Sequence, residues 1–151
     1  MRLPLLVLLC SSQSLAAERP RLAVLVVIDQ LGASTFEQRL PLATAGIKRL
    51  VAEGVWVKQL RYESAPSVTA AGHATLATGS WPSSHGIVSN EWFDEALGKK
   101  VYAAEDPRYQ ILGREPLPRD STSPWLLRVP TLGDTFKAFR KESKSVAVSG
   151  K

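Results

Sequence analysis

Two side chains of this chain, Asp29 and Thr69, stand in contexts suited to chemistry. Asp29 directly follows the apolar run at residues 22–28, and a carboxylate at the carboxyl end of a buried strand is how α/β proteins build sites. Thr69 stands where a turn leads into small residues that predict a helix, whose N-terminus favours anions. Together they suggest a threonine nucleophile, held by a metal, that attacks phosphorus.

The segments around these residues predict an α/β protein. The run at residues 22–28 is rich in β-branched side chains, as expected of a central parallel strand. A helical pattern covers residues 36–53, within which Pro41 marks an alternative helix start. Residues 55–62 alternate like a second strand, and a helix follows Thr69. This order predicts a doubly wound, mostly parallel sheet.

The second half adds a hairpin and a loop to this sheet. Residues 91–102 resemble two short strands joined by a turn around Gly98. Residues 106–130 hold five of the ten prolines and are predicted to be mostly loop, either framing a pocket or only connecting elements. Residues 131–143 return to helix, and residues 145–149 begin another buried strand.

The order and spacing of the motifs resemble the alkaline phosphatase superfamily. The similarity is to the branch that holds type I phosphodiesterase/nucleotide pyrophosphatases and alkaline phosphatases with a threonine nucleophile. The matching pieces are Val-Val-Ile-Asp-Gln at 26–30, Arg-Leu-Val-Ala-Glu-Gly at 49–54, Pro-x-x-Thr-x-x-Gly-His at 66–73 and Thr-Gly-x-x-Pro-x-x-His-Gly-Ile-x-x-Asn at 78–90. The resemblance covers residues 21–151 and implies that residues 18–151 are the N-terminal part of a longer catalytic domain.

The resemblance implies roles for four residues. Asp29 and Thr69 would bind a metal, and Thr69 would be the nucleophile; sulfatases need Cys or Ser at this place. Asn90 resembles an amide donor to a phosphoryl oxygen, and the backbone N–H groups after Thr69 would add donors. Lys151 matches the lysine of a Lys-x-Arg pair in phosphomonoesterases of this branch. Two divalent ions, with Zn²⁺ as the family expectation, would complete the site.

Each of these four residues also has a plainer interpretation. Asp29 fits a cap of a helix or turn, and Thr69 fits an ordinary helix N-cap. Asn90 fits a turn residue before the hairpin, and Lys151 fits a flexible terminal lysine.

The two histidines, His73 and His85, are assigned to packing or to hydrogen bonds that support the site. The sequence offers no pair of histidines four residues apart, of the kind that builds zinc sites. The histidine ligands of the resembled family come from later segments. This polypeptide alone is therefore expected to lack appreciable activity.

The expected activity is hydrolysis of a small phosphate ester through a covalent phosphothreonine, with a phosphomonoesterase favoured. One alternative is a phosphodiesterase or nucleotide pyrophosphatase. Another is a catalytically inactive fragment or a ligand-binding remnant. A third is a phosphonate or sulfate-ester hydrolase on the same scaffold.

Composition and the N-terminus place the chain among exported globular proteins. Hydrophobic residues make up 44% and charged residues 22%, which permits a packed core. The net charge of +5 comes from scattered Lys and Arg without a nucleic-acid-binding motif, and the denser stretch at 137–144 fits a solvated helix face. The sequence carries no indication of oligomeric state.

Residues 1–17 have the pattern of a signal peptide, with a short positive start, an apolar region and a cleavage site near Ala17. The apolar stretch is too short to span a membrane. Cleavage would remove Cys10, the single cysteine, and would leave neither a disulfide nor a thiolate zinc site. A periplasmic or secreted protein is expected.

Overall fold

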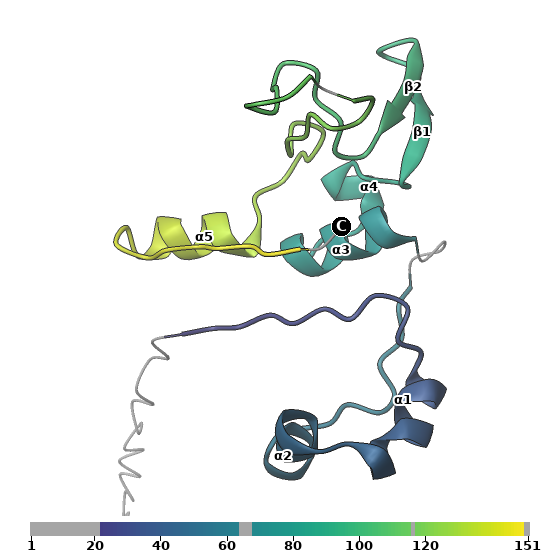
Figure 1. Ribbon diagram of the computed structural model, residues 1–151, viewed down its shortest axis with the longest axis vertical. Coiled ribbons are helices and arrows are strands. Elements are labelled where there is room, and N and C mark those ends of the chain that lie inside the picture. The colour runs from purple at the N-terminus through teal and green to yellow at the C-terminus, as the bar shows by residue number, and fades with distance from the viewer. Residues whose placement is uncertain (1–21, 64–67, 116, 150–151) are drawn as a thin grey trace, which may run out of the picture.

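The computed structural model describes residues 22–63, 68–115 and 117–149, and Figure 1 shows its elements. In chain order they are α1 (Ala33–Arg39), the 3-10 helix η1 (Leu40–Leu42), α2 (Ala45–Glu53), α3 (Thr69–Thr78), α4 (Pro82–His85), β1 (Glu91–Asp94), β2 (Lys99–Tyr102) and α5 (Leu132–Phe139). The predicted signal peptide at 1–17, Pro66 and Lys151 lie outside the described residues.

The predicted hairpin is confirmed. Strands β1 and β2 pair in antiparallel fashion, with Glu91 opposite Tyr102 and Asp94 opposite Lys99. Gly98 in the connecting turn has a φ of 62°, a conformation that glycine adopts without steric cost. Five residues connect α4 to the hairpin, and Asn90, just before β1, is hydrogen-bonded to Ala70, so the hairpin begins beside the start of α3 (Figure 1).

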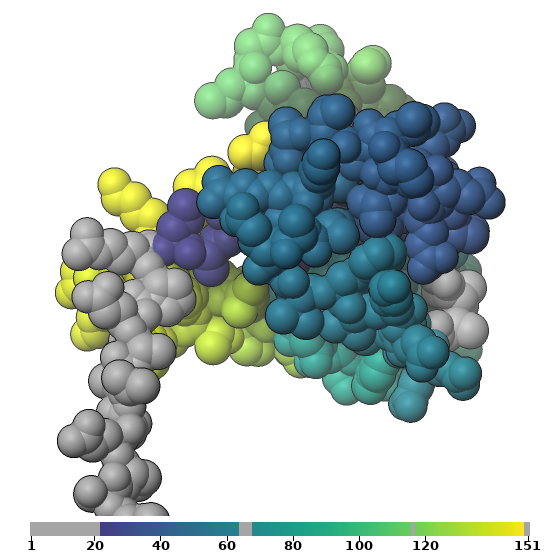
Figure 2. Space-filling view, turned by 90° about the horizontal axis from the view of Figure 1, so that it is seen from below, coloured from purple at the N-terminus to yellow at the C-terminus, as the bar shows by residue number. Residues whose placement is uncertain are grey.

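The predicted doubly wound, mostly parallel sheet is not found in the described residues. The runs at 22–28, 55–62 and 145–149 are extended or turn-like and form no strand ladder there. They remain exposed, with Val26 at 73% and Val148 at 94% of full accessibility. A central strand needs a neighbour on each edge and cover on both faces, and these runs have neither in the described structure. Figure 2 shows atoms of the first run and of the C-terminal segment open on one face.

The single helix expected over residues 36–53 is wrong, because the chain forms three shorter pieces there. The first helix, α1, begins earlier, at Ala33, and ends at Arg39. Pro41 then lies in η1, where its missing N–H cannot continue the α-helical hydrogen bonds. Helix α2 follows after Thr44. The alternative helix start at Pro41 is thus only a 3-10 turn.

The buried side chains all come from one stretch of the described chain. They lie in α3, at the end of α4 and in the connection after it, in β2 and at the start of the proline-rich loop. The apolar members are Ala71, Ile87 and Val101, and the polar members are His85 and Asp106. This stretch is therefore the packed centre that supports the N-terminus of α3.

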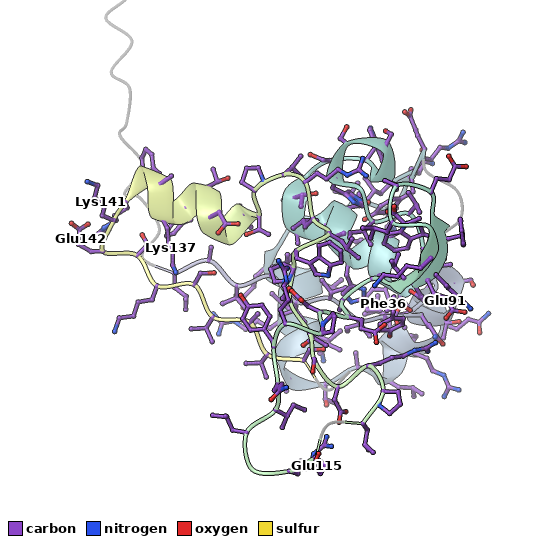
Figure 3. All side chains as sticks on the ribbon, turned by 90° about the horizontal axis from the view of Figure 1, so that it is seen from above. Phe36, Glu91, Glu115, Lys137, Lys141 and Glu142 are labelled. Atoms are coloured by element: carbon purple, nitrogen blue, oxygen red, sulfur yellow. The ribbon has the colours of Figure 1, made fainter. Side chains whose placement is uncertain are left out.

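Helix α5 is the last helix of the described residues, and it ends at Phe139 rather than at residue 143 as predicted. A capping box joins Thr131 and Asp134 at its start, as the return to helix predicted. Lys137, Lys141 and Glu142 point outward around its second half and its end (Figure 3). Within the described ranges, no helix has the length and apolar character needed to cross a bilayer.

Candidate active site

Asp29 and Thr69, 40 residues apart in the sequence, are joined by a hydrogen bond. The Thr69 hydroxyl donates to the Asp29 carboxylate, with Oγ1 and Oδ2 3.1 Å apart. The apolar run ends at Asp29 in a turn in which Gln30 has a φ of 61°. Residues other than glycine rarely adopt this left-handed conformation. The structure therefore brings together the two residues whose contexts first indicated chemistry.

A pocket of about 470 Å³ lies beside this pair. Its lining includes Asp29 and Thr69 together with Tyr62 and His73. Small-molecule sites are typically about 300–1,000 Å³ in volume, with mostly apolar walls and a few polar groups. The pocket thus has room for a small phosphate ester next to the hydroxyl.

Thr69 is the first residue of α3 rather than its N-cap. Val68 occupies the N-cap position with an extended backbone, and no side chain caps this helix. The Thr69 hydroxyl instead faces Asp29, so the interpretation of Thr69 as an ordinary N-cap does not apply. The partial positive charge at the N-terminus of the ten-residue helix lies next to the hydroxyl and favours negative charge there.

Asn90 is held against the start of α3 by one hydrogen bond. The Ala70 N–H donates to Asn90 Oδ1 over 2.8 Å. Because a backbone N–H only donates, the atom it meets is the amide oxygen, and the NH₂ group lies on the other side of the amide carbon. The N–H groups after Thr69 were predicted to donate to the substrate. In the structure, the Ala70 N–H orients Asn90 instead.

His73 lines the pocket and supports the helix start. Its Nδ1 lies 2.7 Å from the Thr69 carbonyl oxygen, one helical turn away. A carbonyl oxygen only accepts, so Nδ1 carries the proton in this bond. This hydrogen bond agrees with the supporting role expected for His73.

His85 is buried completely, as the packing assignment predicted. Its Nδ1 accepts from the Ile87 N–H, and its Nε2 lies 3.1 Å from Thr75 Oγ1. Burial lowers the pKa of His85 below its ordinary value of 6.5. The ring is therefore neutral at physiological pH and links α3 to the segment that leads to Asn90.

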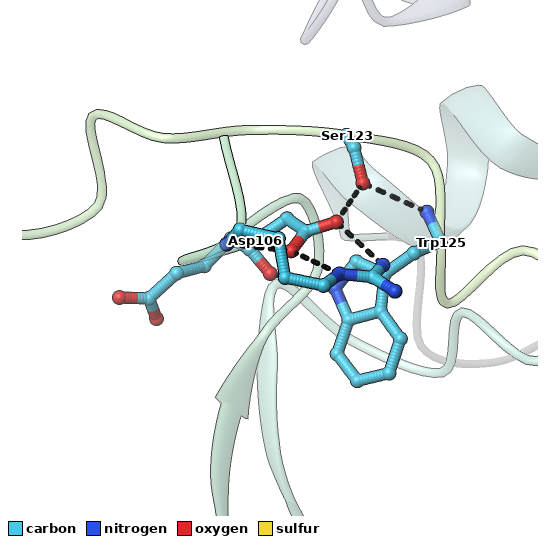
Figure 4. A network of polar contacts seen from close by, with 5 residues as sticks. Asp106, Ser123 and Trp125 are labelled. Carbon is cyan, nitrogen blue, oxygen red and sulfur yellow. Dashed lines mark hydrogen bonds and ion pairs between the residues drawn. The ribbon is translucent and has the colours of Figure 1, made fainter. Parts of the chain in front are cut away.

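The proline-rich loop is anchored by a buried carboxylate (Figure 4). Asp106, at 1% accessibility, accepts two hydrogen bonds from the Arg108 guanidinium, 2.8 and 2.7 Å long, and another from Ser123. The Arg108 hydrogen bonds hold the pKa of Asp106 well below its usual range. The Trp125 indole donates to the Glu105 carbonyl, and the Arg108 guanidinium lies over its ring. The loop thus has a fixed base beside the hairpin.

Several residues that shape the site could not be recognised from the sequence. Tyr62 lies on the pocket wall, although the alternating pattern marked it only as the end of a strand. Thr75, the hydrogen-bond partner of His85, was not predicted from the sequence. Its hydroxyl among the small residues of α3 was the one feature that could have indicated a buried hydrogen bond. Asp106 was counted only as the start of a loop. Lys151 lies outside the described residues, so its predicted role stays a prediction.

The oxygen atoms at this site are suited to a divalent cation. Asp29 and Thr69 present a carboxylate oxygen and a hydroxyl oxygen 3.1 Å apart, close enough for both to reach one ion. Carboxylate oxygen is a common zinc ligand and also suits magnesium and manganese. Among the described residues, no group of three or more His, Cys, Asp and Glu side chains gathers around a point. The pair therefore fits part of a metal site.

Comparison with known proteins agrees with the motifs. A family model described as type I phosphodiesterase / nucleotide pyrophosphatase matches residues 23–149. This chain belongs to that family. The match runs from the strand-like run before Asp29, through Thr69 and Asn90, to the segment after α5, so both halves of the site lie within it.

Several relatives in the alkaline phosphatase superfamily share this part of the sequence. Alkaline phosphatase PhoK of a Sphingomonas species is 37% identical over 143 residues, which cover 93% of this chain and 25% of that protein. Alkaline phosphatase PafA of Elizabethkingia meningoseptica is 37% identical over 99 residues, covering 65% of this chain and 18% of that protein. An uncharacterized pyrophosphatase/phosphodiesterase of Schizosaccharomyces pombe is 54% identical over 37 residues, 24% of this chain and 8% of its own. The chain spans about a quarter or less of the length of these relatives.

Proposed function

We propose that this chain is the N-terminal part of the catalytic domain of an exported, metal-dependent phosphoric ester hydrolase. The observation that carries the proposal is the Thr69–Asp29 hydrogen bond, which places a hydroxyl and a carboxylate together at a helix N-terminus beside a pocket. Family membership and the alkaline phosphatase relatives support phosphoester chemistry as the use of that pair.

In the proposed reaction, Thr69 Oγ1 attacks the phosphorus atom in line with the leaving group. The new Thr69–phosphorus bond forms as the bond to the leaving alcohol oxygen breaks; the hydroxyl proton of Thr69 is released to solvent, and the departing alcohol takes up a proton from solvent. Water then attacks the phosphothreonine, which releases phosphate and restores the Thr69 hydroxyl. Asp29 orients the nucleophilic oxygen through the bond already present between them.

Asn90 has a separate part in this proposal. Its amide oxygen is held by the Ala70 N–H, so its NH₂ group is available to donate to a phosphoryl oxygen that gains charge. A donor oriented in advance is worth about 2.7–4 kcal/mol of transition-state stabilisation in comparable sites. Lys151, together with an arginine two positions further on, would add positive charge for a monoester dianion.

Asp29 and Thr69 would hold one of two divalent ions, for which Zn²⁺ is our proposal. Bound there, such ions supply Lewis acidity that lowers the pKa of a coordinated hydroxyl or water. In water an isolated threonine hydroxyl is a weak nucleophile, which is why the proposal includes metal ions. We expect this segment alone to be inactive, because the metal ligands of later segments are needed.

A phosphomonoesterase is our first choice of activity, and a phosphodiesterase or nucleotide pyrophosphatase is the second. The relatives named alkaline phosphatase and the position of Lys151 favour the monoesterase. The family description and the Schizosaccharomyces pombe relative favour the alternative. The signal peptide proposed at residues 1–17 would direct the protein to the periplasm or the exterior.

The test compares three forms of the intact protein that contains this segment: wild type, Thr69→Ser and Thr69→Ala. Each is assayed on p-nitrophenyl phosphate and on bis-p-nitrophenyl phosphate, before and after chelation and with zinc restored. We expect Thr69→Ala to lose activity by at least about 10⁴-fold, as loss of a nucleophile does in other hydrolases. Thr69→Ser keeps the hydroxyl and is expected to keep measurable, zinc-dependent activity.

Undiminished ester cleavage by Thr69→Ala would refute the nucleophile. A strong preference of the wild type for the bis ester would leave the nucleophile in place and establish the diesterase alternative. Rapid-quench trapping of a phosphorylated wild-type protein, absent in Thr69→Ala, would identify the covalent intermediate directly.

A further inference from the structure

His85 is a buried polar residue in the packed centre, and it has no role in the reaction proposed above. It ends the short helix α4, has no accessible surface, and precedes Gly86, whose φ is 84°. The Arg128 N–H donates to the His85 carbonyl oxygen over 3.0 Å. The Arg128 side chain lies so close to Gly86 that a Cβ there would be 2.9 Å from Arg128 Cδ. The backbone of His85 and Gly86 therefore packs against both the backbone and the side chain of Arg128.

The hydrogen bonds of His85 have a defined direction. The Ile87 N–H donates to Nδ1, so in the neutral ring the proton is on Nε2. Nε2–H then donates to Thr75 Oγ1, which donates in turn to the Ala71 carbonyl oxygen over 2.9 Å. The Ile87 N–H, the His85 Nε2–H and the Thr75 hydroxyl therefore each donate to one acceptor. A chain of this kind, buried and fully satisfied, specifies one arrangement of the elements that it joins.

The hydrogen bonds of His85 and the hydrogen bond of Asn90 attach segment 85–90 to helix α3 at two points. His85 is attached to α3 at Thr75, and Asn90 is attached to α3 at Ala70. The two attachment points are five positions apart in the helix, about 7.5 Å along the axis. Ile87, in the segment between, is buried. The segment 85–90 therefore runs back along α3 toward the nucleophile and is held at both ends.

We propose that His85 is a positioning residue for phosphoryl transfer, acting through its Nε2–H bond to Thr75. That bond sets where segment 85–90 lies on α3, and so sets where the Asn90 NH₂ group stands relative to Thr69. The inference rests on the proposed function, because it names what keeps the amide donor of that site in place. His85 touches neither substrate nor metal in this role.

Two substitutions separate the two hydrogen bonds of the ring. Glutamine places an amide nitrogen near the position of Nε2 and keeps the donor to Thr75, while it gives up the acceptor for the Ile87 N–H. Asparagine places an oxygen near the position of Nδ1 and keeps that acceptor, while it gives up the bond to Thr75. His85→Gln and His85→Asn, made in the intact protein, are therefore matched opposites.

We expect His85→Asn to lower kcat by up to about 100-fold with little change in KM, because a displacement of about 1 Å at a reacting group has this effect. His85→Gln is expected to retain most of the kcat. Thr75→Val should reproduce the loss seen in His85→Asn, and Thr75→Ser should not. Combining His85→Asn with Thr75→Val should add no further loss, because both remove the same bond. Urea unfolding of each variant reports its stability separately.

An equal kcat for His85→Asn and His85→Gln would overturn the inference, and so would a greater loss in His85→Gln, which a purely structural turn at His85 predicts. Full kcat in Thr75→Val would overturn it as well. The assay of Thr69→Ala in the otherwise wild-type intact protein tests the proposed function independently. If that variant remains active, the function is wrong; if it is inactive and the two His85 variants agree, only the positioning role is wrong.

Discussion

Two regions of this molecule differ in how far their side chains are buried. From α3 to the proline-rich loop, residues 69–130, side chains meet one another, and this region contains all the buried residues of the described chain. The runs at 22–28 and 145–149 are more apolar in pattern, yet their valines are exposed, 73% for Val26 and 94% for Val148. Apolar pattern alone therefore does not decide which part of the chain forms a core.

The difference follows from the range of the interactions that each region needs. The hairpin and helices α3 and α4 satisfy their backbone groups within a few residues, and the bond between Thr75 and His85, ten positions apart, joins α3 to α4. A parallel strand has no local partner, because its neighbours arrive only after a crossover of a dozen or more residues. The first region therefore packs within the described residues, whereas we expect the second to need neighbouring strands that the described residues do not provide.

The contrast between the two regions would be wrong if the exposed runs at 22–28 and 145–149 do not form buried strands in the intact protein. Val148 and Leu112 are both 94% exposed, but only Val148 lies in a run predicted to be a buried strand. In the intact protein, we expect Val148→Asp to lower the free energy of unfolding by at least about 3 kcal/mol, since an unpaired charge would be buried. Leu112→Asp, the control, should change it by no more than about 0.5 kcal/mol, as surface substitutions do.

Urea unfolding of the two variants measures this difference. If Val148→Asp is as harmless as Leu112→Asp, the run stays at the surface and the doubly wound sheet is the wrong architecture. Equal and large losses in both would show instead that exposure in this segment does not report burial in the intact protein.

The self-packed region should supply a catalytic donor as well as a scaffold, and Asn90 separates the two. Asn90→Asp keeps an oxygen for the Ala70 N–H but replaces the NH₂ donor with negative charge. We expect kcat to fall by about 10²–10³-fold, the range found when a single oriented donor is lost. Stability should change little, because the bond to Ala70 remains. Steady-state kinetics and thermal unfolding of Asn90→Asp beside Asn90→Ala measure both quantities.

Asn90→Ala removes the donor and the scaffold bond together, so it should lose both activity and stability. If Asn90→Asp retains wild-type kcat, the residue acts only as a brace for α3, and the interpretation of Asn90 as a turn residue gains ground.

The smallest effect is a pH dependence confined to the loop anchor. Arg108 lowers the pKa of Asp106 from its ordinary 3.8, so the folded state binds this proton less readily than the unfolded chain. The stabilisation is therefore complete above pH 3.8 and is lost as pH falls through and below it. The Trp125 indole N–H resonance, whose donor bond to Glu105 lies in this network, should broaden or shift over that range. Asp106→Asn lacks the titration and should show a flatter response.

Other carboxylates also have lowered pKa values, so the difference between wild type and Asp106→Asn is the quantity to follow. Glu91, Asp120 and Asp134 belong to this group. Identical acid responses of the two proteins would mean that the Asp106 network does not hold the loop.

Local signals in the sequence predicted local structure well. The turn at Gly98 between alternating residues predicted the hairpin, and small residues after Thr69 predicted α3. Pro41 marked a break that the helical pattern over 36–53 obscured, because one missing N–H outweighs the apolar spacing of neighbours. Asp29 and Thr69 were recognised from their places at the end of an apolar run and at a helix start. The doubly wound sheet was inferred from apolar runs and from the order of elements, and the described residues form no such sheet.

Residue types and spacing established which groups carry the proposed chemistry, because a hydroxyl, a carboxylate and an amide are each set by a single codon. Distance was a different matter. That Thr69 Oγ1 lies 3.1 Å from Asp29 Oδ2, that the Ala70 N–H orients Asn90, and that Thr75 meets His85 follow from folding. These contacts join residues up to 40 positions apart. Their geometry depends on how α3 packs against its surroundings, and no local pattern of side chains encodes that packing.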